Sequence, residues 1–245
     1  MNKAHVRALS LAALLSTPSL AQADGFGQKS QLIVGAERLS GFYSYKIATE
    51  VNGQNNQKID VDDSGSQVSL LWGSSTASTG TVLPVNPASI PRVGADYMFT
   101  DLISFGGSVG WFSASSSTKS QGVSVDNPDY SGFALAPRVG FMLRLADNIA
   151  FWPRVGLTYV AISVEDNTGN TTGQNKYTGV ALTGEGMFVF TPAHGSLGIA
   201  VGPILELPMS GTYKSERRNG AVTTTTEVTS KITNFGAVAG LVAAF

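Results

Sequence analysis

Hydrophobic and polar residues alternate strictly along several stretches of the chain. Between residues 133 and 145 one parity is apolar: Phe133, Leu135, Pro137, Val139, Phe141, Leu143 and Leu145. The opposite parity holds Ala134, Ala136, Arg138, Gly140, Met142 and Arg144. A period of two predicts a β-strand, whose successive side chains point to opposite faces. An apolar face opposed by arginine and glycine is typical of a barrel whose outside meets lipid and whose inside holds charge.

The tetrapeptide Pro-Arg-Val-Gly occurs three times in such runs, at residues 91–94, 137–140 and 153–156. The same alternation predicts eight strands: 32–46, 90–100, 103–111, 133–145, 151–159, 180–190, 197–207 and a last one ending at residue 245. Pro137, Pro153 and Pro203 fall inside these strands and cannot donate to a ladder, so we expect β-bulges to accommodate them, at positions that the sequence does not fix.

Short turns and long polar segments separate the predicted strands in alternation. The long segments are 47–89, 113–129, 165–176 and 209–227. This rhythm is typical of an outer-membrane barrel with short periplasmic turns and long external loops. We interpret most of 47–89 as one external loop; the alternative is an additional hairpin, which would give ten strands. The predicted fold is therefore all-β, an eight-stranded antiparallel transmembrane β-barrel.

The composition narrows the class of protein further. Charged residues make up 13% of the 245 residues, and there is no cysteine, which excludes disulfides and thiolate catalysis. Lys3 and Arg7, an apolar core and a small-residue site ending at Ala23 predict an export signal over 1–23, followed by a barrel domain over 24–245. Beyond that signal no apolar run is long enough for a transmembrane helix. The mildly acidic mature chain lacks the excess of basic residues that is typical of nucleic-acid-binding proteins.

Charged residues on the non-lipid parity are the candidate site. The predicted barrel-interior charge network consists of Arg92, Asp96, Arg138, Arg144, Arg154, Glu185 and Glu206, with Glu37 as a further candidate. Glu37 and Arg38 are adjacent, so we expect only one to point inward. Charges in so narrow an interior must pair. The network is either a structural plug or the lining of a selective pore, and the plug is favoured because barrels of this size seldom hold a channel.

Two short motifs resemble sites of other chemistry, and each departs from the pattern it resembles. Residues 106–110 match the hydrolase pattern around Ser108, yet they continue an alternating strand instead of a strand-to-helix elbow. The one histidine of the mature chain, His194, lies in a predicted turn. Residues 60–65 resemble the start of a calcium loop, but position twelve is Leu71 and not glutamate; we interpret them as a solvated acidic loop. No catalytic residue, metal site or cofactor is predicted.

The chain resembles the small eight-stranded outer-membrane β-barrel family of the outer-membrane protein A and opacity-protein type. The resemblance rests on the signal peptide, the hairpin rhythm and the alternating final strand that ends in Phe245. It implies recognition by the barrel-assembly machinery. The barrel pattern itself predicts residence in the bacterial outer membrane and contact with its lipid, and the long loops are candidates for binding an extracellular ligand. The resemblance does not extend to a peptidoglycan-binding domain.

Three functions are compatible with this sequence. The leading hypothesis is a non-enzymatic envelope protein with surface loops for interaction. The alternative is a narrow channel for water, ions or small solutes, and the second alternative is a barrel enzyme that acts on lipid or peptide. A soluble ligand-binding barrel is disfavoured because it would place apolar residues inside and charges outside.

Overall fold

A computed structural model describes residues 26–52, 58–70, 73–75, 86–115, 117–120, 123–126, 128–168, 171–192 and 195–245. Almost all of these residues are in β-strands, and among them no helix is long and apolar enough to cross a membrane. The elements are β1 (Leu32–Asn52), β2 (Lys58–Leu70), β3 (Gly73–Ser75), the 3₁₀ turn η3 (Pro87–Ser89), β4 (Arg92–Met98), β5 (Ile103–Ala114), β6 (Ser117–Ser120), β7 (Val123–Asp126), β8 (Asp129–Phe141), β9 (Leu143–Ala146), β10 (Ile149–Thr168), β11 (Thr171–Phe190), β12 (Leu197–Asn219) and β13 (Val222–Ala244).

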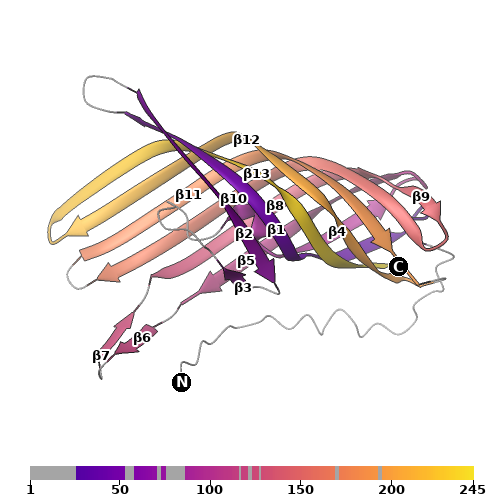
Figure 1. The fold of residues 1–245 in the computed structure, drawn as a ribbon, viewed down its shortest axis with the longest axis horizontal. Coiled ribbons are helices and arrows are strands. Elements are labelled where there is room, and N and C mark those ends of the chain that lie inside the picture. Colours follow the sequence, from indigo (N-terminus) through magenta and orange to yellow (C-terminus); the bar gives the residue numbers. More distant parts are fainter. Residues whose placement is uncertain are drawn as a thin grey trace.

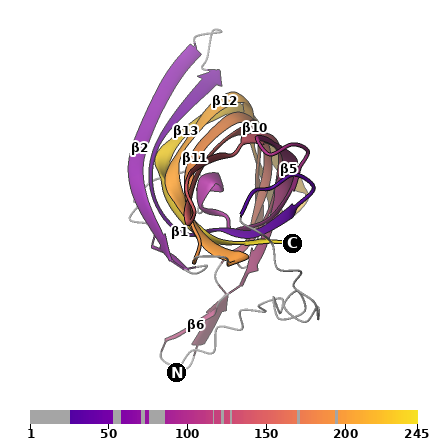
Figure 2. The ribbon, with the colours of Figure 1, turned by 90° about the vertical axis from the view of Figure 1, so that its right-hand side faces the viewer.

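Eight antiparallel strands form a closed ring, in the order β1, β4, β5, β8, β10, β11, β12 and β13. The ring closes because β13 pairs with β1, from Ile33 opposite Ala244 to Glu50 opposite Thr229. Figure 2 shows this ring with η3 inside it and β2 outside it. The predicted fold class is confirmed. The additional hairpin within residues 47–89 also exists, but β2 and β3 branch from β1 and leave the ring at eight strands.

The outer surface of the ring carries the apolar parity of each strand. Large side chains with 38% or more of their surface exposed include Phe42, Val93, Phe105, Trp111, Leu135, Val155, Leu182, Leu205, Phe235 and Leu241. A soluble protein would bury such residues, whereas a transmembrane barrel turns them toward lipid. The rejected soluble barrel is therefore inconsistent with the structure.

All four predicted long loops are in large part strand. β10 and β11 pair up to Thr168 opposite Thr171, and β12 and β13 pair up to Asn219 opposite Val222. Figure 1 shows the β12–β13 and β1–β2 hairpins extending from the end of the barrel opposite the C-terminus. The loop predictions were wrong because polar Ser, Thr and Asn were read as turn residues. Outside lipid, both faces of a strand can be polar.

β1 changes its neighbour halfway along. Its first part, up to Glu37 opposite Arg92, pairs with β4, whereas its second part, from Ser40 opposite Leu70, pairs with β2. At this change the turn η3 lies within the ring, with Ala88 fully buried. The ring is thus continuous at the end of the barrel near the C-terminus, whereas toward the other end β1 pairs with β2 in place of β4.

The expected bulges at the in-strand prolines are not found. Pro137, Pro153 and Pro203 each pair with one neighbouring strand, opposite Gly107, Gly186 and Ala237. On the other side the ladder is interrupted, and the register is the same before and after the gap at residues 137 and 203. Each proline therefore costs ladder bonds on one side only, and no extra residue is inserted.

Candidate functional site

Eight buried charges form one alternating chain across the barrel interior. In order of contact they are Asp96, Arg138, Glu37, Arg154, Glu185, Arg38, Glu206 and Arg92. Each has 9% or less of its surface exposed. They come from β1, β4, β8, β10, β11 and β12, strands far apart in the sequence. Four carboxylates face four guanidinium groups, so the chain is electrically neutral.

The first half of the chain is built around Arg138. Its two terminal nitrogens donate to the Glu37 carboxylate, Nη1 to Oε2 at 2.7 Å and Nη2 to Oε1 at 2.6 Å. Its Nε donates to Asp96 Oδ1 at 3.0 Å, and Nη2 also contacts Asp96 Oδ2. Arg154 Nη1 then donates to Glu37 Oε1 at 2.7 Å. A fork-to-fork pair of this kind fixes orientation as well as charge.

The second half is built around Arg38. Its Nη1 donates to Glu206 Oε1 and to the carbonyl oxygen of Ala88, both at 2.9 Å, and its Nη2 lies 3.1 Å from Glu185 Oε1. Glu185 Oε2 in turn lies 2.6 Å from Arg154 Nη2. Arg38 therefore joins the two halves of the chain and also holds the turn η3.

The chain ends at Arg92. Its Nη2 lies 3.6 Å from Glu206 Oε1, and its Nη1 donates to Thr158 Oγ1 at 3.4 Å. Asn234 Nδ2 donates to the other oxygen of Glu206 at 3.1 Å. Two neutral side chains, Thr158 and Asn234, thus contact the end of the chain where the guanidinium contacts are longest.

The expectation that only one of Glu37 and Arg38 points inward is wrong. Arg38 has a left-handed backbone, with φ +57°, and the register of β1 against β13 shifts between Ala36 and Ser40. This bulge removes the alternation locally, so neighbouring side chains share the interior. A positive φ is uncommon for a residue other than glycine. In the sequence, residues 32–46 alternate less regularly than the other predicted strands, and this irregularity is the one sequence signal for the bulge.

Arg144 does not belong to the network. The strand breaks at Met142, β9 is exposed throughout, and Arg144 Nη2 donates to the carbonyl oxygen of Gly27 at 2.9 Å. The prediction extended one alternating run past the end of the barrel. The remaining predicted residues (Arg92, Asp96, Arg138, Arg154, Glu185 and Glu206) do meet in the interior. From the sequence, a turn centred on Asp147 predicts that Arg138 lies opposite Gly156 and Arg154 opposite Gly140, and this register is found.

The other candidate motifs give no second site. Ser108 lies buried in the middle of β5, where residues 106–110 continue the strand; His194 lies outside the described residues. Residues 60–65 belong to strand β2 instead of the expected acidic loop, and Asp62 pairs with Lys46 at 2.7 Å. Within the described residues no group of His, Asp or Glu side chains could hold a metal ion.

Two apolar clusters enclose the charged chain. Trp152, Met98, Met142 and Met187 belong to the cluster near the C-terminal end, and the Trp152 ring lies 4.6 Å from the Arg154 guanidinium carbon. Ile47, Ile90, Val160, Ile162, Tyr177 and Ile232 belong to the cluster at the other end. Two voids beside the charges measure about 10 Å³ each, which is room for a single water at most.

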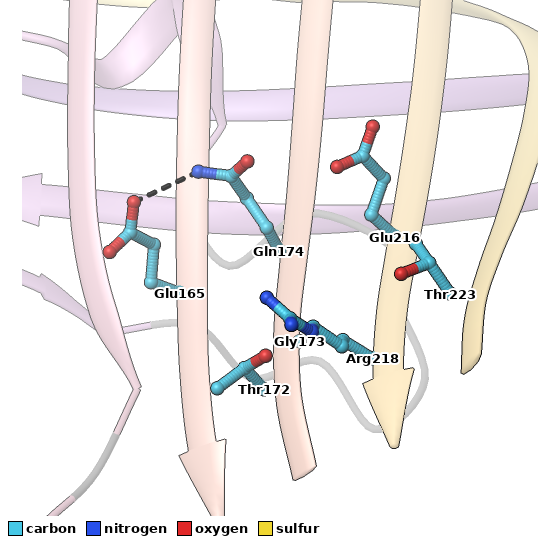
Figure 3. Close-up of a pocket in the computed structure, with 7 residues that line it drawn as sticks. All are labelled: Glu165, Thr172, Gly173, Gln174, Glu216, Arg218 and Thr223. Atoms are coloured by element: carbon cyan, nitrogen blue, oxygen red, sulfur yellow. Dashed lines mark hydrogen bonds between the residues drawn. The ribbon is translucent and has the colours of Figure 1, made fainter. Parts of the chain in front are cut away.

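A hollow of about 380 Å³ lies on the extended strands beyond the barrel. It is lined by Glu165, Thr172, Gly173, Gln174, Glu216, Arg218 and Thr223 (Figure 3). These residues come from β10, β11, β12 and β13, and Gln174 Nε2 donates to Glu165 Oε1 at 2.9 Å. The hollow faces solvent, unlike the charged barrel interior.

Comparison with solved structures gives the class of protein. The structure is similar to the outer membrane protein OprG from Pseudomonas aeruginosa, with a TM-score of 0.52 and 11% identity over 91% of this chain and 98% of that chain. Ail from Yersinia pestis (TM-score 0.35, 8% identity, 88% and 99% covered) and the outer membrane protease OmpT from Escherichia coli (0.31, 8%, 94% and 99%) also match. No protein-family model and no curated protein matches the sequence.

The closed ring, the lipid-facing apolar exterior and the likeness to OprG define the class. The chain has the fold of the small outer-membrane β-barrels, with the apolar exterior of a barrel that spans a membrane.

Proposed function

We propose that the protein is a closed, non-conducting barrel that displays its extended hairpins at the cell surface. The observation that carries this proposal is the neutral charge chain between two apolar clusters, with voids of only about 10 Å³ beside it. Ions need a continuous wet path, and none fits through so tightly paired a layer. The channel stays the alternative function.

Single-channel recording in a planar bilayer tests this proposal. We expect no conductance steps from refolded residues 24–245, whose insertion is verified by flotation with the lipid. The matched variant E37A/R154A keeps the charge balance but removes two long side chains from the middle of the chain. That variant should conduct, which shows that the assay detects an opened lumen. Defined steps from the unmodified protein would overturn the closed barrel in favour of the channel.

The display of the hairpins can be tested with cysteine labelling, because the chain has no native cysteine. Long extensions of outer-membrane barrels face outward and short turns face the periplasm. We expect T224C, near the end of the β12–β13 hairpin, to react with an impermeant maleimide on intact cells. D147C, in the turn between β9 and β10, should react only after permeabilisation. The reverse pattern would contradict the proposed orientation.

We also propose that the protein is not an enzyme. Ser108 is buried with 4% of its surface exposed, and no described histidine lies near it. Ser108→Ala is therefore expected to leave peptide and lipid turnover of the purified protein unchanged, within the background of a heat-unfolded control. Loss of a measurable hydrolysis in this variant would favour the enzyme alternative. Recognition by the barrel-assembly machinery stays a prediction.

A further inference from the structure

Four lysines lie just beyond the apolar band on four consecutive strands of the ring, β11, β12, β13 and β1. They are Lys176, Lys214, Lys231 and Lys46, and each follows an outward apolar residue of its own strand toward the outside: Val180, Met209, Phe235 and Phe42. Three of these intervals are four residues long. The fourth is five and contains the register shift of β12. All four lysines share the outward parity, and we call them the lysine sector.

The spacing places the lysine sector in the headgroup layer. Four residues of a strand tilted by about 45° rise roughly 9 Å along the membrane normal. The interfacial layer on each side of the hydrocarbon is about 5–8 Å thick. The ammonium groups, at the ends of flexible side chains, therefore reach the depth of the lipid phosphates just above the apolar band.

The sector covers one side of the ring only. At the corresponding positions, four residues beyond Tyr159 on β10, Phe133 on β8 and Trp111 on β5, lie Ser163, Asp129 and Ser115, the last of which directly follows the end of β5. A general attraction to an anionic surface would be satisfied by cations all round the barrel. Cations confined to four adjacent strands indicate a local binding surface.

Two of the lysines stand directly opposite each other. Lys176 on β11 pairs in register with Lys214 on β12. Like charges at such positions destabilise a sheet unless an anion lies between them. Glu216 lies 2.5 Å from Lys214, and this hydrogen bond raises the pKa of Lys214, so its ammonium stays charged. The pair is solvent-exposed, and exposed pairs exchange partners at little cost.

The polar hollow described above adjoins this pair. Gln174 and Glu216, which line it, are the next outward residues of β11 and β12 beyond Lys176 and Lys214. The hollow adds the Arg218 guanidinium and the hydroxyls of Thr172 and Thr223 (Figure 3). Ammonium and guanidinium groups bind phosphate, and hydroxyl and amide groups bind sugar hydroxyls.

We propose that the lysine sector and the adjoining hollow bind the phosphorylated sugar headgroup of an outer-leaflet glycolipid. The acyl chains of this lipid lie against the apolar band below the lysines. The headgroup phosphates lie among the lysines, and the sugars reach toward the hollow.

A competition experiment with the refolded protein in detergent tests the proposal. Tagged protein is mixed with equal amounts of bisphosphorylated lipid A and chemically dephosphorylated lipid A, and the retained lipids are counted by mass spectrometry. Each basic residue near an anionic headgroup contributes about fivefold in affinity. We therefore expect the phosphorylated lipid to be enriched roughly tenfold or more. The variant K46Q/K176Q/K214Q/K231Q should retain the two lipids almost equally.

Two variants control for folding and for charge alone. Lys29→Gln removes an exposed lysine at the opposite end of the barrel and should leave the enrichment unchanged, and the fourfold lysine-to-arginine variant should keep it. All variants must show the gel mobility of a folded barrel. An unchanged enrichment in the fourfold glutamine variant, or an equal loss in Lys29→Gln, would overturn the proposal. Complete displacement by millimolar inorganic phosphate would also overturn it, since the site would then bind the free ion.

Discussion

Arg38 connects several parts of the barrel interior. Its guanidinium pairs with Glu185 and Glu206 and donates to the carbonyl oxygen of Ala88, and its left-handed backbone directs the side chain inward. Removing one partner of a buried ion pair typically costs about 3–5 kcal/mol, because the remaining charge is uncompensated. We expect Arg38→Ala to lower the free energy of unfolding by about this amount, measured by urea titration in detergent micelles.

Arg144→Ala is the matched control, since this arginine is exposed and makes one hydrogen bond to a backbone carbonyl. Its loss should cost less than about 1 kcal/mol. Arg38→Gly distinguishes the effect of the lost charge from the effect of backbone strain, because glycine adopts φ +57° freely and alanine does not. If Arg38→Gly unfolds as easily as Arg38→Ala, the lost charge is responsible. A neutral Arg38→Ala would show that Arg38 does not join the charge chain.

Gly94 tests how tightly the charges are packed. A Cβ on this residue would lie 2.8 Å from Arg138 Nη2 and 2.8 Å from Glu37 Oε1, closer than real contacts allow. Gly94→Ala is expected to cost about 1–3 kcal/mol in unfolding free energy, the usual range for overpacking. Gly184→Ala is the control, because a Cβ there meets nothing within 4 Å. Equal effects of the two substitutions would mean that the charge layer yields without cost.

At the scale of the strands, alternation predicted the part of the fold that lipid constrains. Within the membrane one face must be apolar, so a period of two in β4, β8 and β12 placed Arg92, Arg138 and Glu206 correctly. Two features could not be predicted from this alternation. The hairpins above the membrane are polar, so no apolar face marks them as strands. The bulge at Arg38 is accompanied by ion pairs with β11 and β12, which are distant in sequence and not apparent from the local pattern.

The difference between the barrel and its polar hairpins also predicts the rates of amide hydrogen exchange in β12 and β13. Leu197–Glu206 pairs with β13 on one side and β11 on the other, around a filled interior. Residues 214–227 belong to a hairpin whose side chains are exposed or half-buried. Amides in weakly packed segments open at low free energy. Hydrogen exchange with mass spectrometry should therefore show residues 214–227 exchanging roughly tenfold faster, or more, than residues 197–206. Equal protection would place the hairpin in the cooperative unit of the barrel.

For the molecule as a whole, the stability of the barrel depends on the balance of the interior charges. The chain alternates from Asp96 to Arg92, so its end pair, Asp96 and Arg138, can be removed together and leave three carboxylates against three guanidinium groups. Arg138→Met alone leaves the Asp96 carboxylate without its ion-pair partner, at a position where only 1% of the residue is exposed. We expect this single variant to lose about 3–5 kcal/mol of unfolding free energy.

The double variant D96N/R138M should regain most of that loss, because no charge is then left without a partner; Glu37 keeps Arg154 at 2.7 Å. The coupling between the two substitutions, obtained from a double-mutant cycle in the same urea titrations, is expected to exceed about 2 kcal/mol. Additive effects would mean that water reaches Asp96 and screens it. In that case the interior would be wet, and the closed barrel would give way to the narrow channel, so that this one cycle links the stability of the charge chain to the question of conduction.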